Sequence, residues 1–158
     1  MATFEVQVEG LTGLSIDGSS SPTQSELTQY LRDGVLEVTT KSLSSNPALA
    51  VQFQRESGEQ DSNGFVTNGA QVLTVVRESG TNNDWRPCNP VPIALQSRVT
   101  DVDSIYYASK FSPVFTGLDE GKINIYPEAS GGGADSYIVY YVNNDPLDND
   151  DNNIAYNS

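Results

Sequence analysis

Two residue types that carry much of enzyme and metal chemistry are almost missing from this chain of 158 residues. The sequence has no histidine and a single cysteine, Cys88. The usual pairs of a nucleophile with a histidine base cannot form, and we expect no metal site. One cysteine also excludes a disulfide within the chain, so we expect Cys88 to be a buried or half-buried free thiol. We expect no enzyme activity and no cofactor.

Basic residues and long apolar runs are also scarce. The chain has eight Lys and Arg residues and 21 Asp and Glu residues, which gives a net charge of −13. Such a chain repels polyphosphate, so we expect no sequence-specific nucleic-acid partner. No apolar run approaches the ~18 residues of a membrane span, and MATFEVQVEG lacks the basic start and apolar core of a secretory signal. With these classes excluded, action through protein surfaces is favoured.

The C-terminal segment, residues 145–158, is rich in aspartate and has no basic residue. Asp148, Asp150 and Asn152 match the spacing with which a calcium loop begins. Asn153 stands where such a loop requires glycine, and no glutamate follows at its twelfth position. We interpret the segment as an acidic, flexible and solvated tail.

The N-terminal part has helical signals. Residues 3–14 fit a strand or a helix, and we favour a short helix. Thr23 is followed three residues later by Glu26, the pattern of a capping box, and Lys41 suits the C-terminal end of the helix. The apolar stripe of this helix consists of Leu27, Tyr30, Leu31, Val35 and Val38.

A further short helix is expected after these two helices. Asn46 and Pro47 can act as its cap and first residue, and we expect it to end near Ser57. The polar, turn-rich segment that follows leads to a predicted strand at 70–78.

Next comes a loop at 79–92, which contains three prolines and which Trp85 would anchor by burying its ring. A short helix at 102–108, capped by Asp101 or Asp103, precedes the β-rich C-terminal third.

The last third predicts three strands, at 114–116, 122–126 and 137–142. Pro127 ends the second strand because proline cannot donate to the ladder, and Gly131–Gly133 belong to the loop that follows. We expect these strands to form a small antiparallel meander with long polar loops. The fold class is therefore α+β. We expect one domain over residues 1–144, helical to about 57 and β-rich from about 70.

Tyrosines cluster in the β-rich part, among them Tyr106, Tyr107, Tyr126 and Tyr137. Adjacent residues of a strand point to opposite faces, so adjacent tyrosines cannot form one sugar-binding platform. Packing within the domain is favoured, and aromatic anchoring of a contact between subunits is the alternative.

Several stretches resemble proteins of tailed phages. "FEVQVEGLTGLSI", a polar loop and the helix "SELTQYLRDGVLEVTTK" are similar to the start of head–tail adaptor, or connector, proteins. "INIYPEASGGGADSYIVYYVNNDP" has a strand ending in Tyr-Pro, a loop, an aromatic strand and a proline, a pattern common in such proteins. "TDVDSIYYASKFSPVF" and "MATFEVQVEGL" look like virion structural proteins of marine phages, including those that infect cyanobacteria.

The resemblance implies a virion structural protein at the portal–tail junction, present in the host cytoplasm during assembly. It would form a homo-oligomeric ring that binds portal protein on one side and tail proteins on the other. A capsid decoration protein, or a tail-surface module that binds a glycan or receptor, is the alternative. The candidate interface residues are Leu27, Tyr30, Leu31, Val35, Val38, Phe115, Tyr126, Tyr137, Tyr140 and Tyr141.

Overall fold

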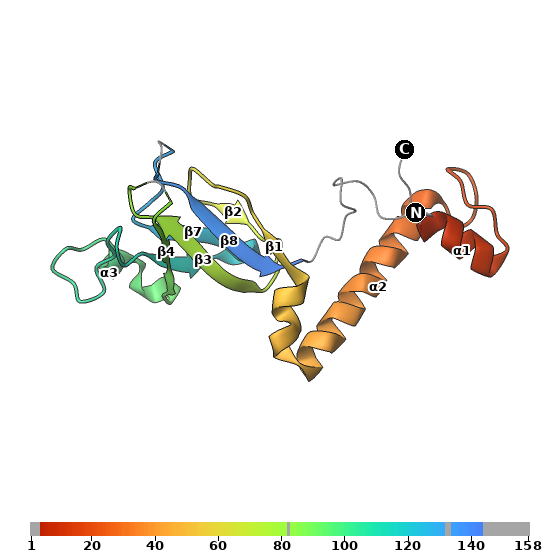
Figure 1. Cartoon of the computed structure of the whole chain (residues 1–158), viewed down its shortest axis with the longest axis horizontal. Coiled ribbons are helices and arrows are strands. Elements are labelled where there is room, and N and C mark those ends of the chain that lie inside the picture. Colours follow the sequence, from red (N-terminus) through yellow and green to blue (C-terminus); the bar gives the residue numbers. More distant parts are fainter. Residues whose placement is uncertain (1–3, 82, 132–133, 144–158) are drawn as a thin grey trace. The chain divides into compact units, whose positions relative to one another are not determined.

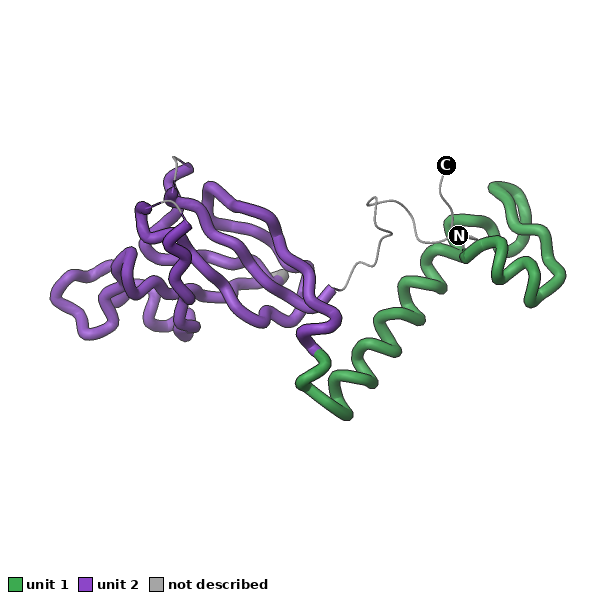
Figure 2. The backbone as a smooth tube through the Cα atoms, viewed as in Figure 1, with its two compact units in different colours: residues 1–49, 144–158 green, residues 50–143 purple. Residues whose placement is uncertain are grey.

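The computed structural model describes residues 4–81, 83–131 and 134–143, and it divides them into two compact units. The described part of the first unit is residues 4–49, and the second unit is residues 50–143 (Figure 2). Within the range 1–144, over which one domain is expected, each of the two units has apolar clusters of its own. The expected acidic tail at 145–158 lies outside the described residues.

The first unit is a pair of helices (Figure 1). Helix α1 spans Phe4–Thr12, which agrees with the short helix expected at 3–14, and helix α2 spans Gln24–Ser45. Ile16 and Leu27 form a small buried cluster, against which Val8 of α1 and Leu31 of α2 pack. Among the described residues, no helix is both long enough and apolar enough to cross a membrane.

Helix α2 begins at the predicted capping box. The Thr23 hydroxyl oxygen accepts a hydrogen bond from the Glu26 backbone N–H at 3.3 Å, and the Glu26 carboxylate accepts one from the Thr23 N–H at 2.8 Å. These bonds satisfy two of the N–H groups that a helix start leaves without intrahelical partners. The hydrogen bonds that the Glu26 carboxylate accepts from the Thr23 N–H and the Thr23 hydroxyl lower the pKa of Glu26. The helix continues four residues beyond Lys41, the residue expected near its end.

The further expected helix is a tighter and shorter element. Pro47–Phe53 form a 3₁₀ helix, η1, and the Asn46 side-chain oxygen accepts a hydrogen bond from the Ala48 N–H at 3.2 Å. The helix does not reach Ser57, because strand β1, Gln54–Glu56, pairs with the strand β8 at the other end of this unit's sequence.

The described strands of the second unit form two four-stranded sheets (Figure 1). The first has the order β1–β8–β3–β4, with β8 at Tyr137–Val142, β3 at Val72–Glu78 and β4 at Trp85–Pro87. The second has the order β2–β7–β6–β5, with β2 at Phe65–Val66, β7 at Lys122–Tyr126, β6 at Val114–Gly117 and β5 at Asn89–Pro90. All pairs are antiparallel except β5 with β6, which is parallel.

The core of this unit lies between the two sheets. Val75, Tyr137 and Val139 of the first sheet pack with Ile123 and Ile125 of the second. The alternation along β7 follows the pleat, because Ile123 and Ile125 are buried while Lys122 is exposed. The α+β class is therefore confirmed.

The expected meander is wrong in one pairing. Strands β6 and β7 pair as predicted, but β8 joins the other sheet instead of pairing with β7. The reason is that β2 occupies the second edge of β7, with Phe65 opposite Ile123. Strand β2 lies within residues 57–69, whose polar, turn-rich sequence predicts no strand.

Two further predictions, a loop at 79–92 and a helix at 102–108, also differ from the structure. The segment 79–92 contains the short strands β4 and β5, and Trp85 is half-buried within β4.

The helix expected at 102–108 is absent, and turns take its place. The Asp101 carboxylate accepts a hydrogen bond from the Asp103 N–H at 3.1 Å, a local bond that competes with the helical pattern. The helix of this region, α3, lies earlier, at Gln96–Val99, after the 3₁₀ helix η2 at Ile93–Leu95. A further 3₁₀ turn, η3, spans Asp119–Gly121.

The cap of α2 gives a first testable prediction. Thr23→Ala removes the side-chain acceptor and should lower the stability of the helical unit by about 1 kcal/mol. Far-ultraviolet circular dichroism during thermal unfolding would measure the loss. Thr40→Ala, at an exposed position inside the same helix, is the matched control and should not destabilise the helix. Equal losses in both variants would contradict the capping role.

Candidate functional site

The apolar stripe of α2 is covered only near its N-terminal end. Leu27 is 5% exposed and Leu31 is half-buried, so both belong to the unit's own core. Further along the helix, Val35 is 40% exposed and Val38 is 61% exposed, and Tyr30 on the flank of the stripe is 62% exposed. Of the five candidate interface residues of this helix, Tyr30, Val35 and Val38 are therefore available to a partner, whereas Leu27 is not.

Tyr137 is also a core residue, not an exposed interface residue. Its side chain is fully buried, and its hydroxyl donates a hydrogen bond to the Ser62 carbonyl at 3.0 Å. The same oxygen accepts a hydrogen bond from the Phe65 N–H at 3.3 Å. Burial raises the pKa of Tyr137. This tyrosine therefore connects β8 to the start of β2 and cannot contact another subunit.

The other four aromatic candidates are half-buried. Phe115 and Tyr141 pack against the main core, and the Tyr141 ring centroid lies 5.8 Å from that of Phe65. Tyr126 packs against a second, smaller cluster, and Tyr140 lies in β8 opposite Glu56 of β1. Each contributes to the unit's own packing and keeps part of its ring at the surface. The ten candidates are thus divided between the two units.

A buried arginine holds the glycine-containing loop against β3. The Arg77 side chain is fully buried and its Nη2 lies 2.5 Å from Asp135 Oδ1. Arg77 also donates from Nε to the Pro127 carbonyl at 2.8 Å and from Nη2 to the Glu128 carbonyl at 3.2 Å. A buried guanidinium needs such partners because an unpaired buried charge is costly.

Asp135 sits at the centre of this network. Burial acts to raise the pKa of Asp135, but the hydrogen bond from Ser130 and the Arg77 guanidinium outweigh it, and the pKa lies below its ordinary value. The Lys110 ammonium adds to the effect from 3.4 Å. The charged form of Asp135 therefore stabilises the fold.

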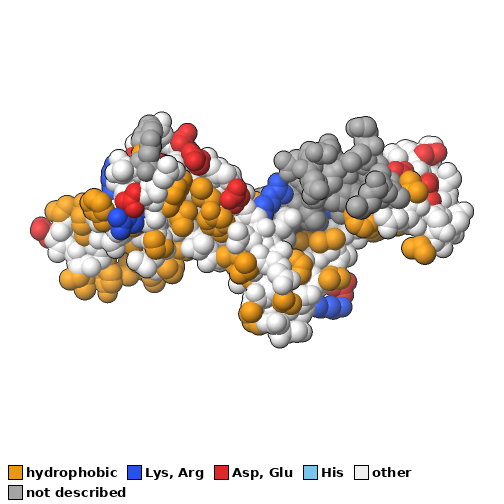
Figure 3. Space-filling model, viewed as in Figure 1, with side chains coloured by type: hydrophobic (Ala, Val, Ile, Leu, Met, Phe, Trp, Pro, Cys, Tyr) orange, Lys and Arg blue, Asp and Glu red, His pale blue; other side chains and the backbone are white. Residues whose placement is uncertain are grey.

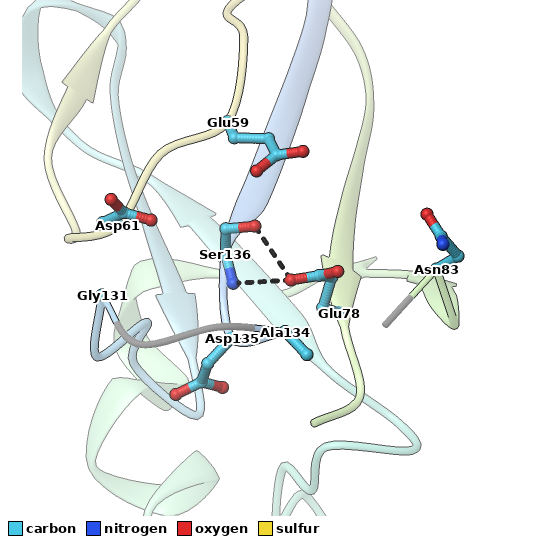
Figure 4. A pocket seen from close by; sticks show the side chains of 8 residues that line it. All are labelled: Glu59, Asp61, Glu78, Asn83, Gly131, Ala134, Asp135 and Ser136. Carbon is cyan, nitrogen blue, oxygen red and sulfur yellow. Dashed lines mark hydrogen bonds between the residues drawn. The ribbon is translucent and has the colours of Figure 1, made fainter. Parts of the chain in front are cut away.

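An acidic pocket opens next to this network (Figure 4). It has a volume of about 390 Å³ and is lined by Glu59, Asp61, Glu78, Asn83, Gly131, Ala134, Asp135 and Ser136. The Glu78 carboxylate accepts hydrogen bonds from the Ser136 N–H at 3.3 Å and from the Ser136 hydroxyl at 3.1 Å. Glu78 and Asp135 thus already hold structural partners. Among the described residues, no group of three acidic or cysteine side chains could hold a metal ion.

The pocket was not anticipated from the sequence. Glu59 and Asp61 come from the connection between β1 and β2, and Glu78 comes from the end of β3. Their proximity results from the pairing of β8 with both β1 and β3, which carries no local sequence signal. Cys88, in contrast, is buried as expected, and burial raises the pKa of this thiol to about 12.

Several highly exposed apolar side chains of the second unit lie close together in residues 100–112, which we name the apolar loop. Val102 is 71% exposed, Ile105 is 93% exposed and Phe111 is 70% exposed, while Tyr106 and Tyr107 are each 45% exposed. Figure 1 shows the loop after α3 projecting beyond the strands, and Figure 3 shows hydrophobic side chains gathered over that end of the unit. The sequence signal for this loop is a set of apolar residues that fits neither the helical nor the strand period.

No protein-family model, curated protein or solved structure matches the chain.

The buried arginine gives a second prediction. Arg77→Met leaves Asp135 and the backbone carbonyls of Glu78, Pro127 and Glu128 without the guanidinium that donates to them. We expect a loss of about 3 kcal/mol or more in the free energy of unfolding. Urea denaturation would measure it. Arg86→Met is the matched control, because Arg86 lies opposite Arg77 in β4 but its pair with Asp84 is partly exposed to solvent. A much smaller loss is expected there. Similar losses in both variants would contradict the role of the buried network.

Asp135 gives a third prediction, on pH dependence. Its pKa is lower in the folded state than in the unfolded chain, so the unfolded chain binds more protons in acid. The stabilisation is complete above the unfolded pKa of about 4 and is lost as the pH falls through the lower, folded value. Asp135→Asn should therefore be less stable than the unaltered protein at pH 7, and the gap should narrow below pH 4. Urea midpoints measured from pH 7 to pH 2.5 would test this, and a gap independent of pH would contradict it.

Proposed function

We propose that this protein is a non-enzymatic virion structural protein, a head–tail adaptor that forms a ring between portal and tail. It acts by binding copies of itself and neighbouring virion proteins. The observation that carries the proposal is the display of large exposed apolar side chains on both units. Clustered exposed apolar residues are typical of surfaces that bind other proteins.

A ring needs two different surfaces on each subunit, because each copy contacts its neighbours head to tail. The exposed part of the α2 stripe, with Tyr30, Val35 and Val38, provides one candidate surface. The half-buried aromatic residues of the second unit, Phe115, Tyr126, Tyr140 and Tyr141, provide the other. The resemblance of the N-terminal and β-rich segments to phage adaptor proteins supports the position at the portal–tail junction.

The strongly negative net charge of the chain fits the same role. A ring that surrounds DNA during its passage should not grip it, and a chain with a net charge of −13 repels the phosphate backbone. Acidic surfaces thus suit a channel component as well as a part that faces water.

The proposal predicts a particular place and a particular mode of assembly. Antibody-gold labelling of particles of the phage that encodes the chain should mark a single vertex, with few copies per particle. Purified protein should bind rings of the portal protein encoded by the same genome. Label spread over the capsid would favour a decoration protein instead, and absence from particles would refute a virion role.

The α2 surface is tested with a pair of charge variants. Val38→Glu places a carboxylate on the exposed stripe and should reduce binding to neighbouring copies or to portal rings, measured by light scattering and by co-sedimentation. Thr40→Glu makes the same charge change at another exposed position of the same helix and should leave binding unchanged. Equal binding by both variants would exclude this surface from the contact.

A tail-surface module that binds a glycan is the second candidate, and the exposure of Tyr106 and Tyr107 is the observation that favours it. Half-exposed aromatic rings can stack on apolar sugar faces. Binding to a glycan array that is lost in Tyr106→Ala would support this alternative over an adaptor.

A further inference from the structure

We infer that the apolar loop, residues 100–112, packs against the same loop of a second copy of the chain across a two-fold axis. This contact is separate from the closure of a ring, and it would join two copies whether or not the protein occupies the neck of a virion. The argument rests on how the loop is held, on what it displays and on its charge.

The loop is held by its own backbone. Its base contains Val99 and Ala108, which are 1% and 2% exposed, and the Ala108 N–H donates to the Val99 carbonyl at 2.9 Å. Within the loop, the Ser104 N–H donates to the Asp101 carbonyl at 3.0 Å and the Tyr107 N–H donates to the Ser104 carbonyl at 3.0 Å. The conformation thus does not depend on the exposed side chains, so little ordering entropy remains to be lost on binding.

The loop displays side chains that gain from burial. Ile105 is almost fully exposed, and Val102 and Phe111 are mostly exposed. The Arg86 guanidinium lies over the Phe111 ring at 5.8 Å and leaves most of that ring accessible. Isolated exposed apolar residues are common in proteins, but several in one short loop indicate a contact with another apolar surface.

The charge of the region selects a second copy as the occupant. The apolar loop contains one basic residue, Lys110, and two acidic ones, Asp101 and Asp103, and Arg98 just before it brings the net charge of residues 98–112 to 0 in a chain of −13. Two copies of a chain with a net charge of −13 repel each other overall, and a neutral segment lets them approach with little local repulsion. Across a two-fold axis, Arg98 of one copy can pair with Asp101 or Asp103 of the other.

The position of the loop also suits such a contact. It projects beyond the strands at one end of the second unit, so two copies can meet through their loops without the sheets colliding (Figure 1). Ile105, the most exposed side chain of the loop, should lie close to the two-fold axis.

A solution experiment tests the contact. Sedimentation equilibrium of the full chain should show association, and Ile105→Glu should raise the dissociation constant about tenfold or more. Because Ile105 is 93% exposed, this substitution should not unfold the protein, which circular dichroism would verify. Val51→Glu, at an apolar position that is 71% exposed outside the loop, is the matched control and should associate as the unaltered protein does.

A crosslinking experiment tests the two-fold geometry independently of any ring. Ile105→Cys should give a covalent dimer under mild oxidation with diamide, whereas Val51→Cys and the unaltered chain, whose Cys88 is buried, should not. The inference is overturned if Ile105→Cys gives no covalent dimer, or if Ile105→Glu associates as strongly as the unaltered chain.

A membrane is the other surface that an apolar loop could enter. Flotation of the chain with neutral phosphatidylcholine vesicles, lost in Ile105→Glu, would overturn the inference and assign the loop to a lipid surface instead. The single-vertex labelling of particles does not depend on this contact. Failure of the loop contact and failure of the proposed function can therefore be told apart.

Discussion

The second unit depends on the contact between its two sheets, where Ile123 and Ile125 of β7 pack against Val75, Tyr137 and Val139. Neither sheet could stand alone, because several strands are only two or three residues long and a short strand forms few ladder bonds. Joining the sheets face to face lets a modest number of apolar residues exclude water from both. The long polar connections are then tolerated because they run over the surface of this core.

Buried polar side chains fix loop segments that the small apolar core does not hold in place. Arg77 and Tyr137 are both fully buried, and both hydrogen-bond to backbone groups of connecting segments. Arg77 binds the connection between β7 and β8, and Tyr137 binds the start of β2. Such buried polar residues select one conformation of the loops. The desolvation free energy of burying them is offset only while every hydrogen-bond partner remains in place. The acidic pocket beside them is a consequence of this arrangement.

The sequence was most informative where the signal is local. The capping box at Thr23 and the alternation of Ile123 and Ile125 predicted a helix start and a strand correctly. Strand partners were not predictable, because Phe65 and Val66 form too short a run to be recognised, yet they displace β8 into the other sheet. Periodicity identified the α2 stripe but could not show that Leu27 packs with Ile16 and Val8 while Val38 stays exposed. The apolar loop was missed because its turns follow no repeating pattern.

Trp85 is the one tryptophan of the chain, and it lies half-buried in β4, next to the strand that carries Arg77. The long helices, in contrast, belong to the first unit. Intrinsic tryptophan fluorescence therefore observes the β-rich unit alone. Its emission distinguishes the melting of one part of the chain from that of the other without any added label.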